Sequence, residues 1–249
     1  MKSTFFIAIL VMGHLSVTAQ STKLFDIVHI NIKDTTLRKT EKDFIRKTLH
    51  FFEDENYIVR KTCSGEWGGT IVFKSKKTGV EYACGATCPV VVNKIDRRYV
   101  VSSSLNHLSG ICRVVQIDHP DSMQIYEPFK PKQKTRKGQV IIRSAGDDES
   151  RSSKGTIALA GTLGMTIIVS FPYEGQLYHV TSDYRQTYLS KIENGKFVHL
   201  DTICDKSLWT YDDTVIQTVD GHYIVFFHNH VTQGYLNISG AKIEVNTYL

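Results

Sequence analysis

The segment Tyr223–Ile238 reads Y-I-V-F-F-H-N-H-V-T-Q-G-Y-L-N-I, two runs rich in β-branched and aromatic residues on either side of a polar turn. Short runs of this kind are typical of antiparallel strands joined by a hairpin. Most of the chain beyond Tyr57 has the same character, with Gly, Asn, Asp and Lys at the breaks between runs. The sequence therefore predicts a mainly antiparallel, all-β fold.

Two further segments repeat this unit of Tyr-x-Val, polar turn and strand ending in Ile. They begin at Tyr99 and Tyr178. Tyr178 and Tyr223 are 45 residues apart, a spacing typical of a four-stranded blade, and Tyr99 lies 79 residues before Tyr178. Upstream, G-G-T-I-V-F-K-S-K-K-T-G at Gly68 is echoed by K-G-T-I-A-L-A-G-T-L-G at Lys154.

At these residues, over Trp67 to Leu249, the chain resembles the β-propeller class of repeat proteins, and it also looks like exported bacterial β proteins. The resemblance implies about five blades. A large antiparallel β-sandwich is the alternative, because the units differ in length and the segment 118–153 fits the period badly.

Ahead of the strands, apolar residues recur at spacings near three and four between Leu37 and Phe52. This pattern predicts one N-terminal amphipathic helix near 37–52, with Thr40 and Asp43 as an interior cap. Residues 20–249 are expected to form a single β-rich domain, for which 41% hydrophobic residues supply a sizeable core.

The first residues have the pattern of a secretory signal peptide. Lys2 precedes the apolar run F-F-I-A-I-L-V-M-G, and V-T-A follows before Gln20. We expect residues 1–19 to be removed by cleavage after Ala19, which places the protein outside the cell or in a periplasm. The rest of the chain has no apolar run long enough for a transmembrane helix, so no transmembrane segment is expected.

The mature chain is mildly basic, and its most basic stretch is K-P-K-Q-K-T-R-K, Lys130 to Lys137. This stretch is interpreted as a solvated loop or as a contact for a polyanion. Export conflicts with a nucleic-acid partner, so none is expected.

All five cysteines lie beyond the predicted cleavage site, where oxidising conditions permit disulfides. The odd number leaves at least one thiol free. Cys84 with Cys88, or Cys63 with Cys112, are both permitted pairings, and spacing does not choose among them.

Several polar and aromatic residues at strand ends suit a sugar or protein ligand. S-S-S-L-N-H-L-S-G offers hydroxyl, amide and imidazole groups, and S-G-E-W-G-G carries a tryptophan that could stack on a sugar ring. The candidate ligand-binding residues are Glu66, Trp67, Ser104, Asn106, His107 and Asp183.

His228 and His230 would project to the same face of a continued strand and could share a metal ion, although a turn after Phe227 is the simpler interpretation. No nucleotide, dinucleotide or metalloprotease motif occurs, so no cofactor is expected. The leading hypothesis is an exported, soluble binding protein for carbohydrate or protein. The alternatives are a secreted carbohydrate-active hydrolase or lyase and a metal-binding protein.

Overall fold

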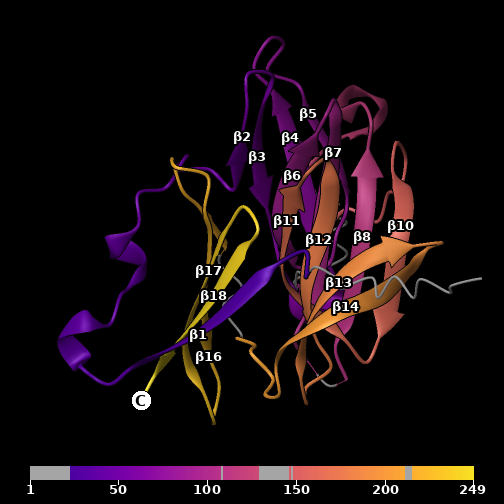
Figure 1. Ribbon diagram of the computed structural model, residues 1–249. Coiled ribbons are helices and arrows are strands. Elements are labelled where there is room, and N and C mark those ends of the chain that lie inside the picture. The colour runs from indigo at the N-terminus through magenta and orange to yellow at the C-terminus, as the bar shows by residue number, and fades with distance from the viewer. Residues whose placement is uncertain (1–22, 108, 129–145, 147, 211–214) are drawn as a thin grey trace, which may run out of the picture.

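The structure is a computed structural model that describes residues 23–107, 109–128, 146, 148–210 and 215–249 (Figure 1). The predicted signal peptide and the basic stretch Lys130 to Lys137 lie outside these residues. Within the described ranges no helix has the length and apolar character needed to cross a bilayer.

The described chain is all-β, as predicted, and its only helices are short 3-10 turns. The strands are β1 (Asp26–Ile32), β2 (Phe52–Glu53), β3 (Tyr57–Lys61), β4 (Thr70–Ser75), β5 (Glu81–Gly85), β6 (Pro89–Ile95), β7 (Arg98–Leu105), β8 (Ile111–Ile117), β9 (Gln124–Ile125), β10 (Ile157–Leu163), β11 (Thr166–Tyr173), β12 (Gln176–Ser182), β13 (Thr187–Glu193), β14 (Lys196–Cys204), β15 (Val215–Gln217), β16 (Tyr223–His228), β17 (Gln233–Ser239) and β18 (Lys242–Tyr248). The 3-10 turns are η1 (Thr35–Leu37), η2 (Glu41–Asp43), η3 (Gly65–Trp67) and η4 (Pro120–Ser122).

These strands form four sheets, each built around a run of strands that are neighbours in sequence. The first sheet has the order β2-β3-β4-β5-β9, the second β10-β8-β7-β6 and the third β11-β12-β13-β14. The fourth has the order β1-β18-β17-β16-β15, in which β1 pairs with β18 in parallel while the other pairs are antiparallel. In Figure 1 the fourth sheet stands beside the other three, with its C-terminal strands in yellow.

The three repeated sequence segments occupy matching places in these sheets. They form the hairpins β7–β8, β12–β13 and β16–β17, each made of the two middle strands of a four-strand run. The hairpin β3–β4 has the same place in the first sheet. We call the turns of these four hairpins the middle turns; their described residues are 62–69, 106–107 with 109–110, 183–186 and 229–232.

The core consists of apolar side chains on the facing sides of the sheets, and one chain of buried polar groups crosses it. The hydroxyl of Ser102 on β7 lies 2.7 Å from that of Ser170 on β11, which lies 2.6 Å from Nδ1 of His179 on β12. Burial lowers the pKa of His179 to about 3, so the imidazole is neutral. The second and third sheets are therefore joined by polar as well as apolar contacts.

The helix expected near 37–52 is wrong. Two short 3-10 turns, η1 and η2, stand in its place, and Thr40 and Asp43 do form a capping box, but around a single turn. Beyond it the chain is extended and pairs with the fourth sheet: Lys47 donates its backbone N–H to Gln217, and Arg46 forms a bridge with Thr218. Tertiary pairing has overridden the helical pattern, leaving Leu49 96% exposed.

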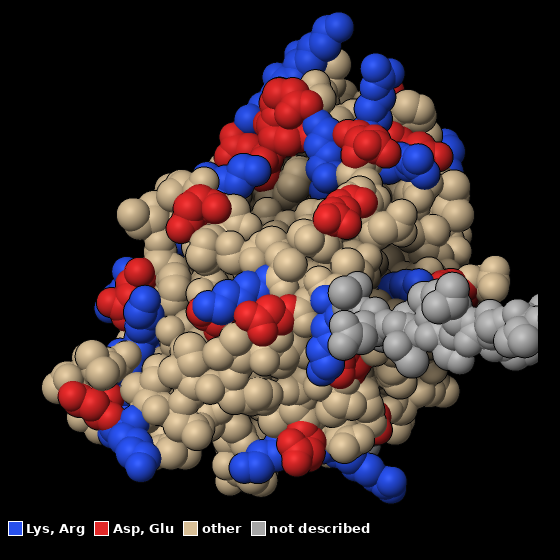
Figure 2. All heavy atoms as spheres, in the orientation of Figure 1, with Lys and Arg blue, Asp and Glu red and all other residues tan. Residues whose placement is uncertain are grey.

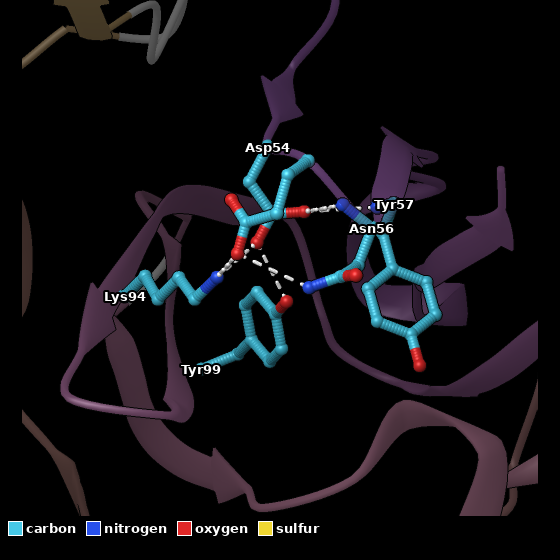
Figure 3. Close-up of polar contacts among 6 residues, drawn as sticks. Asp54, Asn56, Tyr57, Lys94 and Tyr99 are labelled. Atoms are coloured by element: carbon cyan, nitrogen blue, oxygen red, sulfur yellow. Dashed lines mark hydrogen bonds and ion pairs between the residues drawn. The ribbon is translucent and has the colours of Figure 1, made fainter.

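At one end of the molecule, charged side chains tie the first sheet to the second (Figure 3). Asp54, in the turn before β3, accepts hydrogen bonds from Lys94 Nζ at 2.7 Å and from the Tyr99 hydroxyl at 2.6 Å. The backbone N–H groups of Asn56 and Tyr57 also donate to it. Figure 2 shows basic and acidic side chains interleaved at this end, where β2, β3 and β4 turn.

Burial raises the pKa of Asp54, but the hydrogen bonds from Lys94, Tyr99 and the two backbone amides outweigh it and lower the pKa below its usual value. Because the folded pKa lies below the unfolded one, Asp54 stabilises the fold above about pH 4. This contribution is lost as the pH falls through the folded pKa.

We predict that Asp54→Asn lowers the free energy of unfolding by about 3 kcal/mol, because it leaves a half-buried lysine without its main counter-charge. Glu55 also contacts Lys94, but its side chain is 69% exposed, so Glu55→Gln should cost less than about 1 kcal/mol. Urea unfolding of the two variants measures the difference. Equal losses in both would contradict the role assigned to Asp54.

Candidate functional site

The stretch S-G-E-W-G-G forms the middle turn of the first sheet. Trp67 donates its N–H to the carbonyl of Ser64, and Ser64 donates to that of Gly68, so the turn closes on itself as η3. Gly68 has a φ of 112°, which favours glycine, and a Cβ at Gly69 would lie 2.5 Å from the carbonyl oxygen of Ala86. The tight closure leaves the Trp67 side chain pointing outward, 66% exposed.

A disulfide joins this turn to the chain that crosses from the first sheet to the second. Cys63 is bonded to Cys88, with the two Cα atoms 4.4 Å apart. Neither pairing left open by the spacing forms, because Cys84 and Cys112 are buried within strands as free thiols. Burial raises the pKa of both thiols to about 12, so they are protonated.

Glu149 fixes the same turn from the opposite side. Its carboxylate accepts hydrogen bonds from the hydroxyls of Thr62 at 2.5 Å, Ser64 at 2.6 Å and Thr70 at 2.5 Å. Partial burial raises its pKa, but the three hydroxyls outweigh this effect and lower the pKa. Gly146, just before it, packs directly behind Trp67. The turn is therefore held on both sides while Trp67 stays exposed.

Five of the six candidate ligand-binding residues meet around one hollow of about 380 Å³, which we call the Trp67 pocket. Its wall is the η3 turn, the disulfide and the end of β7 with the turn that follows it. The candidates that line it are Glu66, Trp67, Ser104, Asn106 and His107. The packing of the first sheet beside the second, together with the Cys63–Cys88 bond, brings residues 63–67 and 104–107 to one place.

The carboxylate and imidazole groups of the pocket contact one another. Oε1 of Glu66 lies 2.5 Å from Nδ1 of His107, and their side chains are 50% and 55% exposed. A pair this exposed contributes little to stability. Its polar atoms instead lie at the surface beside Trp67, where a ligand can reach them.

Ser104 and Asn106 have positioning roles. Ser104 is buried, and its hydroxyl accepts the backbone N–H of Ile167 at 2.9 Å, which anchors the end of β7 to the third sheet. Asn106 donates from Nδ2 to the carbonyl oxygen of Thr210 at 2.6 Å. They hold the floor and side of the pocket in place.

Asp183 lies outside the Trp67 pocket. Its Oδ1 accepts the backbone N–H groups of Arg185 and Gln186 at 2.9 and 2.8 Å, which closes the middle turn of the third sheet. Burial raises the pKa of Asp183, but these amides and the Tyr188 hydroxyl outweigh it and lower the pKa. The structure gives this carboxylate a turn-closing role.

His228 ends β16 and His230 lies in the turn beyond it, both exposed, so they do not continue along one strand. Within the described part of the chain no three His, Cys, Asp or Glu side chains come together as a metal site. The third ligand that the metal interpretation requires does not appear there.

The four middle turns are neighbours in space as well as in topology. Glu66 of the first middle turn contacts His107 of the second. Gly110 of the second middle turn packs directly against the Tyr184 ring of the third. The third meets the fourth through Ser207, whose hydroxyl lies 2.7 Å from that of Ser182 and whose carbonyl accepts Asn229 Nδ2. These contacts place the middle turns in a row, with the Trp67 pocket between the first and the second.

Glu149 was not predicted as a site residue, because it lies in a stretch with the composition of a loop and its partners are about 80 positions away. The match between Y-I-V at Tyr57 and Y-I-V at Tyr223 was not predicted as a repeat either. That match places S-G-E-W-G-G in the same position as the other middle turns. The signal that could have identified this turn was therefore present in the sequence.

Comparison with known protein families, with curated proteins and with solved structures finds no match to this chain.

We predict that Glu149→Gln loosens the η3 turn by about 2 kcal/mol, because hydrogen bonds to a charged acceptor contribute about 1.5 to 3 kcal/mol and the amide keeps only one acceptor oxygen. Amide hydrogen exchange across residues 62–70 should become faster at neutral pH. Because the carboxylate stabilises the turn only above its depressed pKa, the two proteins should converge in strong acid. Glu127→Gln, at an exposed site, is the control; equal exchange in all three proteins would contradict the role of Glu149.

Proposed function

We propose that this chain is an exported carbohydrate-binding protein that holds its ligand on the middle turns, at the Trp67 pocket. The observation that carries the proposal is the exposed Trp67 ring beside the Glu66–His107 pair, on a turn fixed by a disulfide and by Glu149.

A sugar suits this arrangement for physical reasons. The C–H faces of a sugar ring are apolar and stack on an indole, while the hydroxyl groups at its edge need hydrogen-bond donors and acceptors. Trp67 supplies the apolar surface, and Glu66 and His107 supply polar atoms next to it. Because the turn is already fixed, binding would cost little conformational entropy.

Export is supported by the disulfide between Cys63 and Cys88, which persists in an oxidising compartment. The signal peptide at residues 1–19 and cleavage after Ala19 remain part of this proposal. A propeller-like arrangement also belongs to it, supported by four successive sheets whose equivalent turns contact one another in sequence.

The second candidate function is a secreted carbohydrate-active hydrolase or lyase. The contact between Glu66 and His107 favours it, since a carboxylate that orients an imidazole is a common acid–base pair. Release of reducing ends or of unsaturated sugars from a bound glycan, lost in His107→Gln, would establish this function in place of simple binding.

We predict that Trp67→Ala weakens glycan binding by about thirtyfold or more, the effect expected when a tryptophan anchor worth about 2 kcal/mol is removed. Binding of the purified mature protein to a glycan array, followed by titration of the best ligand, measures it. Trp209→Phe is the matched control, because Trp209 is half-buried and packs edge-to-face on Tyr184. Unchanged binding by Trp67→Ala would overturn the proposal.

A further inference from the structure

A second hollow, of about 370 Å³, is also lined by Trp67, and we call it the arginine pocket. It is bounded by the cross-over between the first and second sheets, by β8 and by residues 149–153. Trp67 lines both hollows, so a ligand that stacks on its ring can extend into either of them.

Arg113 and Arg151 line this hollow, and both are exposed. Arg113 is on β8 and pairs with Gly161 of β10. A Cβ at position 161 would lie 3.7 Å from Arg113 Cγ, so the absence of a side chain at Gly161 leaves the alkyl part of Arg113 uncovered. Arg151 is in the loop that pairs with the first sheet through the hydrogen bond from Gly85 N–H to the Ser152 carbonyl. One guanidinium group is thus carried to the hollow by a strand of the second sheet, and the other by a loop that pairs with the first sheet.

Neither arginine forms a salt bridge with a carboxylate of the described residues. Arg46 and Arg60, in contrast, contact carboxylates at 2.6 and 2.7 Å. The acidic side chain of the hollow, Glu149, is directed at the hydroxyls of Thr62, Ser64 and Thr70. Two arginines and one carboxylate leave a formal charge of +1.

Arginine matches planar and tetrahedral anions, because its N–H groups form a fork that can donate two hydrogen bonds at once. Ser152 and Ser153 add hydroxyl groups to the same hollow. We infer that the ligand of the Trp67 pocket is an acidic glycan, whose carboxylate or sulfate group is bound by Arg113 and Arg151 while a neighbouring ring stacks on Trp67. This inference rests on the proposed function and names its ligand class.

The test is calorimetric titration of the mature protein with three oligosaccharides of similar length: a sulfated heparin hexasaccharide, hexagalacturonate and neutral cellohexaose. At least one acidic probe should bind about tenfold or more tightly than cellohexaose, and its affinity should fall as salt is raised. The probe that binds more tightly distinguishes sulfate from carboxylate. Failure of both acidic probes to bind more tightly than cellohexaose would overturn the inference.

Variants assign the effect to the two arginines. Arg113→Gln and Arg151→Gln should each weaken the acidic probe about tenfold, and Arg113→Lys should restore part of the loss because it keeps the charge. Arg98→Gln is the control: Arg98 is exposed at the opposite end of β7, about 16 Å along the strand from the position that pairs with Arg113. Equal affinity in wild type and both glutamine variants would overturn the inference.

The two proposals fail in different ways. If Trp67→Ala abolishes binding while the arginine variants bind as wild type does, the glycan site stands and its acidic specificity is wrong. If the arginine variants lose binding while Trp67→Ala keeps it, the anion site stands and the stacking site is wrong. Melting temperatures of the variants, expected within a few degrees of wild type for exposed substitutions, separate lost binding from lost folding.

Discussion

The carboxylate of Glu149 is the interaction on which the candidate site depends. The hydroxyls of Thr62 and Ser64 at one end of the β3–β4 turn, and of Thr70 at the other, donate to it. A single side chain from a distant part of the chain therefore holds the two ends of that turn together. The Cys63–Cys88 bond then ties the turn to the second sheet. Without these constraints a glycine-rich turn would be mobile, and Trp67 would lose entropy on every binding event.

The two ends of the first and second sheets are built differently. At the Asp54 end, opposite charges and a buried tyrosine hydroxyl satisfy one another between the two sheets. Around Trp67, in contrast, the indole ring is exposed, Glu66 and His107 contact each other at the surface, and the nearby Arg113 and Arg151 form no salt bridge with a carboxylate of the described residues. Exposed aromatic and polar groups of this kind can bind a ligand, because they are accessible to it.

Local patterns predicted the parts of this fold that depend on neighbours in sequence. Alternating β-branched runs identified the strands, and the Tyr-x-Val units identified three hairpins that hold the same place in their sheets. The candidates Glu66, Trp67, Asn106 and His107 were found because polar and aromatic residues at hairpin turns are exposed. Their meeting in one pocket depends on sheet packing, which no local pattern contains.

The errors have the same cause. The spacing of Leu37, Phe44 and Leu49 suits a helix, but Phe44 packs on Phe226 and Tyr235 and the chain beside it pairs with the fourth sheet. The cysteine spacing left the pairing open, and the bond that forms joins residues brought together by the crossing between sheets. Glu149 could not be found from its own surroundings, because its three partners are 79 to 87 residues away.

We infer that ligands bind at the Trp67 pocket and extend to Arg113 and Arg151 in the neighbouring hollow. Hydrogen–deuterium exchange of the wild-type protein, with and without the tightest-binding oligosaccharide, tests it most directly. We expect slower exchange in peptides that cover residues 63–69, 104–107 and 149–153, and no change in the turn that contains Asp54. Protection at the Asp54 end, with none around Trp67, would contradict the account.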